Sequence, residues 1–307
     1  MFKMRQDILQ CVGNTSLMAL RRIVPGNGSR ILLKMECENP TGSMKDRMAL
    51  AIIQAAEANG RLTIHSSVVE YTGGSTGVSL AMVCSVRGYP LRIVTSDAFP
   101  REKLDHMRIL GAKLEIIRSE NGRMTEGLTR AMIDAARAIA LETGSFWVDQ
   151  MHNKDQLEGY YGMAEEITSQ TDGKIHCFVQ SVGSAASLKG TGEALRRWDG
   201  RIKIIAVEPA ESAVLSGGPS GAHRIDGIGA GYVVPLWSPD LADRIERVST
   251  QDALAMVHRL AKEEGIFAGT STGANVVAAL RIAEVLTPNA TIVTVMCDTG
   301  MKYLSRG

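Results

Sequence analysis

Residues 67–88 read SVVEYTGGSTGVSLAMVCSVRG, and this stretch decides the fold class. It opens with an apolar, β-branched run at 67–71, passes through a turn rich in Gly, Ser and Thr, and continues as a helical segment at 76–87. Gly88 then supplies a residue that can end the helix in a left-handed conformation. The stretch therefore predicts a strand, a tight turn and a helix in direct succession.

The same alternation repeats along the whole chain. The apolar runs are nearly continuous, as expected for strands covered on both faces, and their alternation with helices predicts an α/β fold with mostly parallel sheets. Eight runs could close a barrel, but the Gly, Ser and Thr loops are concentrated at a few places, which favours two open sheets facing a shared cleft. The predicted strands are 31–35, 67–71, 91–95, 113–117, 146–148, 175–180, 203–208 and 291–296, and the predicted helices are 44–59, 76–87, 101–110, 124–143, 252–264 and 274–286.

The composition indicates a globular chain with two domains. Its 307 residues correspond to two domains of about 150 residues each. Lys and Arg number 34 and Asp and Glu 33, a net charge of +1, which gives no electrostatic reason to expect binding to nucleic acid or to a membrane surface. No apolar run is long enough to span a membrane, and the charged opening is unlike a secretory signal. We therefore expect a cytoplasmic protein.

Several common sites are unsupported by the motifs. The five cysteines and six histidines show no C-x-x-C, H-x-x-x-H or H-E-x-x-H spacing, so neither a metal site nor a disulfide framework is expected. The chain lacks the Walker P-loop and G-x-G-x-x-G, so a dinucleotide site is weakly supported. G-x-S-x-G occurs at 73–77 and 269–273, within two loops rich in small and hydroxyl residues, but a serine hydrolase is not the expected class.

Lys45 stands in the segment NPTGSMKDR, residues 39–47, between a predicted strand and a predicted helix. Ser43 is a good N-cap with Asp46 three residues later, which puts Lys45 in the first helical turn. A cation there opposes the positive end of the helix dipole, so helix stability does not explain it. It is either a solvated surface lysine or an amine whose pKa is lowered by burial and positive potential, which suits Schiff-base chemistry.

Four loops rich in small and hydroxyl residues could bind a ligand. Residues 70–77, EYTGGSTG, expose N–H groups and hydroxyls at a helix N-terminus, which suits a carboxylate or phosphate but is also typical of an ordinary turn. Residues 181–187, SVGSAAS, and 268–274, AGTSTGA, open two further helices, and the first of these suits a single phosphate. Residues 226–231, DGIGAG, form either a flexible loop or a mobile clamp over a small substrate.

Taken in order, these motifs resemble the cysteine synthase family (O-acetylserine sulfhydrylase and cystathionine β-synthase), fold-type II enzymes that use pyridoxal 5′-phosphate. The similarity spans essentially the whole chain. Residues 39–47 are similar to the family's N-P-T-G-S-x-K-D-R, which carries the Schiff-base lysine. The other matching segments are 13–17 for G-N-T-P-L, 71–77 for the substrate loop T-S-G-N-T-G, 149–150 for D-Q, 183–187 for the phosphate cup G-T-G-G-T, 227–231 for G-I-G-A-G, 269–274 for G-x-S-S-G-A, and 303–305 near the end.

The resemblance implies a tryptophan synthase β-like α/β fold, with two open, mostly parallel-sheet domains and the active site in the cleft between them. Residues 1–38 and 147–307 would form the larger domain, which binds the cofactor phosphate. Residues 39–146 would form a smaller, mobile domain that carries the substrate loop. The resemblance also implies a homodimer.

The resemblance assigns a role to each site residue. Lys45 would form the Schiff base and act as the base that removes the α-proton. Thr272 would face the pyridine nitrogen with a neutral hydroxyl, which favours β-elimination and β-replacement over transamination. The other cofactor residues would be Ser75, Gly183, Ser184, Ala185, Ala186 and Ser187, and the substrate residues would be Thr72, Gly73, Gly74, Thr76, Gln150, Gly227, Ile228 and Gly229; no metal ligand is implied.

Some positions depart from the family's pattern. Gly73 and Ser75 stand where the family has Ser and Asn, and residues 185–187 replace two glycines and a threonine. Met151 and Lys154 stand where Phe and Pro are usual. These changes leave the expected cofactor intact and concern the substrate.

We therefore expect a pyridoxal-phosphate-dependent β-replacement on an activated serine of the O-acetylserine type, through an aminoacrylate intermediate. Sulfide is the expected nucleophile and cysteine the product, so the partners are a small amino acid and a small nucleophile. One alternative is net β-elimination, of the cysteine desulfhydrase or serine dehydratase type. Others are replacement by a different nucleophile and a non-catalytic binding protein with the same fold.

Overall fold

The computed structural model describes residues 4–24, 26–122 and 125–306, which fall into two compact units. Unit 1 takes in the described residues within 1–12, 45–156 and 302–307, and unit 2 takes in those within 13–44 and 157–301. The chain therefore passes from one unit to the other four times. These limits differ from those of the predicted functional division, which stays a prediction.

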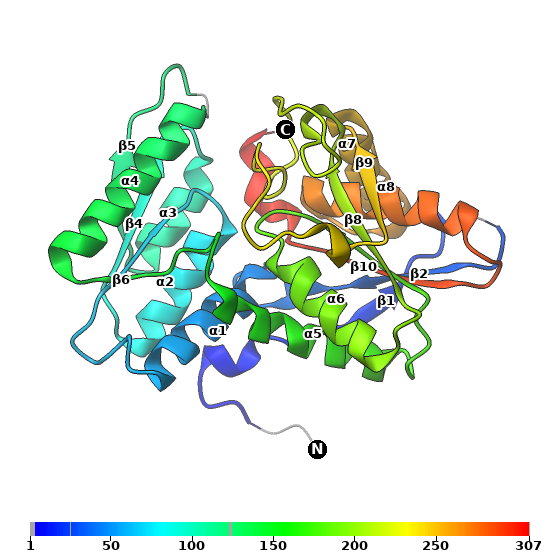
Figure 1. The fold of residues 1–307 in the computed structure, drawn as a ribbon, viewed down its shortest axis with the longest axis horizontal. Coiled ribbons are helices and arrows are strands. Elements are labelled where there is room, and N and C mark those ends of the chain that lie inside the picture. Colours follow the sequence, from blue (N-terminus) through cyan, green and yellow to red (C-terminus); the bar gives the residue numbers. More distant parts are fainter. Residues whose placement is uncertain (1–3, 25, 123–124, 307) are drawn as a thin grey trace. The chain divides into compact units, whose positions relative to one another are not determined.

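Unit 1 contains a four-stranded parallel sheet in the order β5-β4-β3-β6. The stretch 67–88 forms β3, the turn and α2, and Gly88 ends α2 with φ 80°. Figure 1 shows α4 lying along the strands, and α4 contacts β3 and β4. The strands are β3 (Val68–Tyr71), β4 (Leu91–Ser96), β5 (Lys113–Ile117) and β6 (Phe146–Trp147), and the helices are α1 (Lys45–Ala58), α2 (Ser75–Arg87), α3 (Arg101–Ile109) and α4 (Glu126–Thr143).

Unit 2 contains a six-stranded sheet in the order β1-β2-β10-β7-β8-β9, parallel except for β1. Its strands are β1 (Leu17–Ala19), β2 (Arg30–Lys34), β7 (Cys177–Ser181), β8 (Lys203–Pro209), β9 (Arg244–Val248) and β10 (Thr291–Val295). Its helices are α5 (Leu157–Gln170), α6 (Ala186–Trp198), α7 (Thr250–Arg259) and α8 (Thr270–Val285). Short 3₁₀ turns cover Ile8–Cys11, Glu36–Glu38, Lys154–Gln156, Ala210–Ser212, Pro239–Leu241 and Gly300–Arg306, and a π turn covers Leu260–Glu264.

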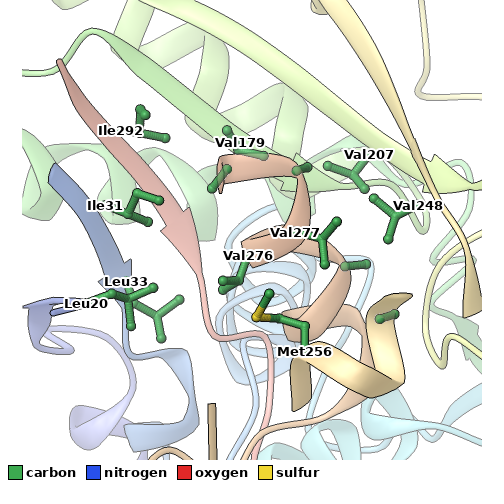
Figure 2. Packing of buried hydrophobic residues seen from close by; sticks show 14 of the residues in the cluster. Leu20, Ile31, Leu33, Val179, Val207, Val248, Met256, Val276, Val277 and Ile292 are labelled. Atoms are coloured by element: carbon green, nitrogen blue, oxygen red, sulfur yellow. The ribbon is translucent and has the colours of Figure 1, made fainter. Parts of the chain in front are cut away.

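The core of unit 2 packs α8 against the sheet. Figure 2 shows Ile31 and Val179, from β2 and β7, on the side of the sheet where Val276 of α8 lies. All three side chains are buried, and burying a side chain of this size contributes about 1.5–3 kcal/mol. The packing fixes α8 on the sheet and with it the first turn of α8, which begins at Thr270.

The prediction of two open, mostly parallel sheets is confirmed. All eight predicted strands are present, with ends that shift by up to two residues. The helix expected at 274–286 begins instead at Thr270, because the small polar residues 270–273 form its first turn rather than a loop. The expected start of the helix at 124 lies outside the described residues, and α4 begins at Glu126. Among the helices described, none is both long enough and apolar enough to cross a membrane.

Candidate active site

The substrate loop, residues 72–76, lies at the carboxyl edge of the sheet in unit 1. Thr72 follows β3, and Gly74 is the N-cap of α2, so Ser75 and Thr76 occupy the first helical turn. The Thr72 Oγ1 atom accepts a hydrogen bond from the Gly74 N–H at 3.1 Å. The positive end of the helix dipole and the N–H groups of the first turn suit an anion such as a carboxylate.

Gln150 lies beside this loop because β6, the strand before it, pairs with β3. The Thr76 hydroxyl donates a hydrogen bond to the Gln150 Oε1 atom. The Gln156 Nε2 atom donates to the backbone carbonyl of Gln150 at 2.6 Å. The structure therefore brings together all the substrate residues that were predicted between 72 and 150.

Glu70, to which the sequence analysis assigned no role, binds the backbone of Gln150. Its side chain is fully buried and accepts hydrogen bonds from the N–H groups of Tyr71, at 2.8 Å, and Gln150, at 3.0 Å. Burial raises the pKa of Glu70 to about 8, although both N–H groups act to lower it. The signal in the sequence was a carboxylate inside an otherwise apolar strand.

The buried carboxyl makes the stability of the protein depend on pH. The pKa of Glu70 is about 8 in the folded chain against 4.5 for a free side chain, so the unfolded chain releases this proton first as the pH rises. As the pH rises from 4.5 to 8, the contribution of Glu70 should therefore make the free energy of unfolding progressively smaller. Urea unfolding at pH 5 and pH 8 should show a smaller pH-dependent loss in Glu70→Gln than in the wild type. Equal losses in the two proteins would contradict this expectation.

Lys45 is the first residue of α1 and is half-buried, so the prediction that it lies in the first helical turn is confirmed. The Oδ1 atom of its neighbour Asp46 accepts a hydrogen bond from the Ser79 hydroxyl at 2.5 Å. This bond ties the first turn of α1 to α2, the helix that begins in the substrate loop. Lys45 is thus held by the same pair of packed helices as the loop.

A second lysine, Lys302, lies at the substrate loop. Its Nζ atom donates a hydrogen bond to the Ser75 Oγ atom at 3.3 Å, and its side chain is only 8% exposed. Lys302 belongs to a segment 227 residues further along the chain, so spacing gave no signal for it. Its charge adds to the positive potential at the N-terminus of α2 and strengthens the case for an anion there.

The phosphate cup, residues 183–187, follows β7 in unit 2 and opens α6. Ala185 adopts the left-handed conformation, with φ 69°, and caps the helix. Successive N–H groups around a left-handed residue form a concavity that binds anions. At Gly183, an added Cβ would collide with the Gly227 carbonyl oxygen, so the backbone there approaches a second loop closely. The cup therefore fits a phosphate group.

The Gly227–Gly231 loop is fixed against the cup. The Gly229 N–H donates to the Val182 carbonyl at 3.1 Å, and the Gly229 carbonyl oxygen lies 2.9 Å from the His223 Nε2 atom. The His223 Nδ1 atom accepts from the Ile225 N–H at 3.3 Å, so the ring proton that bonds Gly229 is on Nε2. The Ile228 side chain packs in the core of unit 2, so the predicted substrate contact at this position would come from its backbone.

Thr272 lies in the first turn of α8 and is fully buried. Its Oγ1 atom accepts a hydrogen bond from the Cys297 N–H at 3.1 Å, which leaves the hydroxyl proton to be donated. Asn275 supports the same region: its Nδ2 atom donates to the Val295 carbonyl at 2.9 Å, and its Oδ1 atom accepts from the Ser181 N–H at 2.7 Å. The sequence analysis assigned no role to Asn275 or Cys297.

Removing the Thr272 hydroxyl should destabilise the protein. Thr272→Val keeps the shape of the side chain but leaves the Cys297 N–H without its acceptor in a buried place. The expected cost is about 1–3 kcal/mol in the free energy of unfolding. Thr272→Ser keeps the acceptor and is the matched control. Urea unfolding of the cofactor-free proteins measures both, and equal stability of the two variants would contradict the assigned hydrogen bond.

The residues present fit pyridoxal phosphate. Within unit 2 there is a concavity that suits a phosphate and a buried hydroxyl donor of the kind that suits a ring nitrogen. Within unit 1, considered by itself, Lys45 is a half-buried amine. Within the described part of the chain, no three side chains of His, Cys, Asp or Glu come together in a way that could hold a metal ion.

Comparisons with known proteins agree with this fit. Residues 8–298 match the family model described as pyridoxal-phosphate dependent enzyme. A cysteine synthase of Staphylococcus aureus is 35% identical over 301 residues, covering 97% of this chain and 95% of that protein. The crystal structure of O-acetyl serine sulfhydrylase isoform 3 from Entamoeba histolytica is similar with a TM-score of 0.93 at 35% identity, covering 99% of this chain and 91% of that one. The structure of an O-ureido-L-serine synthase is similar with a TM-score of 0.92 at 32% identity, covering 99% and 94%.

Proposed function

Because this chain belongs to the family of pyridoxal-phosphate dependent enzymes, we propose that it makes cysteine by β-replacement. In the proposed reaction, sulfide replaces the acyloxy group on the β-carbon of an O-acylated serine, such as O-acetyl-L-serine. The Cβ–O bond breaks and releases acetate, and a Cβ–S bond forms. The net reaction converts O-acetylserine and hydrogen sulfide into cysteine and acetate.

The proposal gives each part of the chain a task. The phosphate cup would hold the phosphate of the cofactor, through Gly183, Ser184 and Ser187 and the backbone of Ala185 and Ala186. Ser75 would contact the phenolic oxygen of the cofactor. Gln150, Thr72 and Thr76 would orient the carboxylate of the amino acid, supported by the backbone of residues 73–74 and 227–229. When bound, pyridoxal phosphate withdraws electrons from the α-carbon of the amino acid. The Lys45 Nζ atom would take the α-proton.

The observation that carries the proposal is the neutral, buried hydroxyl of Thr272. Its oxygen accepts a hydrogen bond from the Cys297 N–H, so the hydroxyl can donate a hydrogen bond to a ring nitrogen. Unlike a carboxylate, it carries no negative charge that would stabilise the protonated form of that nitrogen. Moderate electron withdrawal favours loss of a β-substituent over return of a proton to the α-carbon. This supports β-replacement over transamination.

Product analysis tests the proposal. The purified protein is supplied with O-acetyl-L-serine with and without sulfide, and cysteine, acetate, pyruvate and ammonia are measured. We expect cysteine and acetate in equal amounts when sulfide is present. Pyruvate and ammonia as the main products in the presence of sulfide would instead identify an elimination enzyme. If no donor is turned over, the alternative of a non-catalytic binding protein would be favoured.

A different nucleophile is the second candidate, supported by the departures at Gly73 and Ser75 in the substrate loop and by the similarity to an O-ureido-L-serine synthase. Competition between sulfide and other nucleophiles in the same assay decides this. A homodimer, a cytoplasmic location and a mobile domain at residues 39–146 complete the proposal. Light scattering of the purified protein tests the dimer.

A further inference from the structure

The ring of Phe99 lies directly on Gly73 in the substrate loop. Gly73 follows β3 and Phe99 follows β4, and these strands are parallel neighbours, so both residues lie at the same edge of the sheet in unit 1. A Cβ atom added at residue 73 would overlap the Cγ, Cδ2 and Cε2 atoms of the ring. The ring therefore occupies the space in which a side chain at position 73 would begin.

The backbone does not require glycine at this position. Gly73 is absent from the glycines of positive φ in the described chain, so other residues could adopt its conformation. General crowding is not the cause either, because a Cβ added at the adjacent Gly74 would meet nothing closer than the Thr72 Oγ1 atom at 4.0 Å. The three atoms nearest to an added Cβ all belong to Phe99, so its ring is sufficient to disfavour a side chain at position 73.

Phe99 is itself firmly held. Its N–H donates to the Ser96 carbonyl at 3.3 Å, and the next residue, Pro100, has a fixed φ and is the N-cap of α3. The ring packs against the buried cluster that includes Val69 and Val94. Phe99 is half-buried, so part of the residue stays accessible. The loop thus borders on an apolar ring where a polar side chain would otherwise stand.

We propose that Phe99 determines which amino acid the substrate loop accepts, favouring an O-acylated serine over free serine. The reason is differential solvation. An acyl group gains contact with the ring, whereas a free hydroxyl placed there loses water and finds no hydrogen-bond partner on the ring. The inference rests on the proposed function and adds to it the residue that selects the donor.

The first test is the donor preference of Phe99 variants. It compares kcat/KM for O-acetyl-L-serine with kcat/KM for L-serine, at fixed sulfide, in the wild type, Phe99→Leu and Phe99→Ala. The ratio should fall at least about fourfold in Phe99→Ala, because the contact of roughly one methyl group is lost. Phe99→Leu should lie between the other two. An unchanged ratio would overturn the inference.

The second test is the coupling between the two positions. Gly73→Ser should lower the urea midpoint of the cofactor-free protein and reduce kcat/KM for O-acetyl-L-serine at least about tenfold, because ring and loop must separate. The double variant Gly73→Ser/Phe99→Ala should have a urea midpoint and a kcat/KM for O-acetyl-L-serine close to those of Phe99→Ala, because no clash remains. Gly127→Ser, in α4, is the control, since an added Cβ there meets nothing closer than 4.0 Å. A double variant no better than Gly73→Ser would overturn the inference.

The two proposals fail in different ways. If the wild type forms no cysteine from either donor, the proposed function is wrong and the donor preference falls with it. If the wild type forms cysteine and Phe99→Ala leaves the donor ratio unchanged, only the role of Phe99 is wrong. Should Gly73→Ser fail to fold, the Phe99 variants still decide the question.

Discussion

Replacing Lys45 by alanine should reduce cysteine formation by at least about 10³-fold, because the base that takes the α-proton is lost. The cofactor phosphate should still bind, since the cup at 183–187 is unchanged. Lys113→Ala, at an exposed residue of β5, is the matched control and should keep its activity. Reduction of the wild type with borohydride, followed by peptide mapping, should place the cofactor on Lys45.

The alternative interpretation, that Lys45 is an ordinary solvated surface lysine, predicts the opposite result. A solvated lysine at the start of a helix opposes the helix dipole, so its removal would leave turnover intact and stabilise the helix slightly. Turnover of Lys45→Ala within tenfold of the wild type, or a reduced adduct on another lysine, would reject Lys45 as the reacting amine.

Gly183→Ala should weaken cofactor binding by about 5- to 150-fold. The added Cβ collides with the Gly227 carbonyl oxygen, and shifting two backbone segments costs about 1–3 kcal/mol. The shift also moves the Gly229 N–H, which bonds the Val182 carbonyl beside the cup. Titration of the cofactor-free protein with pyridoxal phosphate, followed by fluorescence, measures the affinity.

A glycine-to-alanine substitution at an uncrowded position is the control for Gly183→Ala. Gly162→Ala lies in α5, where an added Cβ meets nothing within 4 Å, and it should leave the cofactor affinity as in the wild type. Equal affinities in Gly183→Ala and Gly162→Ala would show that the cup does not need the close approach of the two loops.

The predicted strands are each marked locally by a continuous apolar run, and most of the predicted helices by a closing glycine. The helices α5 and α6 were not among those predicted. The strands that were missed carry weaker marks. β1 has three residues and pairs on one side only, and β9 is an edge strand in which three of the five residues are charged. The residues 270–273 resembled a loop in composition, and only packing against the sheet shows that they are helical.

The same limit applies to the candidate site. Lys45 and the Gly-, Ser- and Thr-rich loops were predicted because their residue types are informative within one short segment. Glu70, Phe99 and Cys297 act on residues from other segments, and one chain read alone does not reveal such pairs. Gly73 was noted as a departure from the family's pattern, but its cause, an aromatic ring from the next strand, required the structure.

The four crossings of the chain between the units bear on how the protein forms during translation. Unit 1 depends on residues from 302 onward, including Lys302 at Ser75 and Tyr303, whose ring lies 4.2 Å from the Lys103 Nζ atom. The ribosome makes Lys302 227 residues after Ser75, when the chain of unit 2 is already complete. The hydrogen bond from Lys302 to Ser75 and the contact between Tyr303 and Lys103 can therefore form only after almost the entire chain has been made, whereas the rest of unit 1 is complete by residue 156.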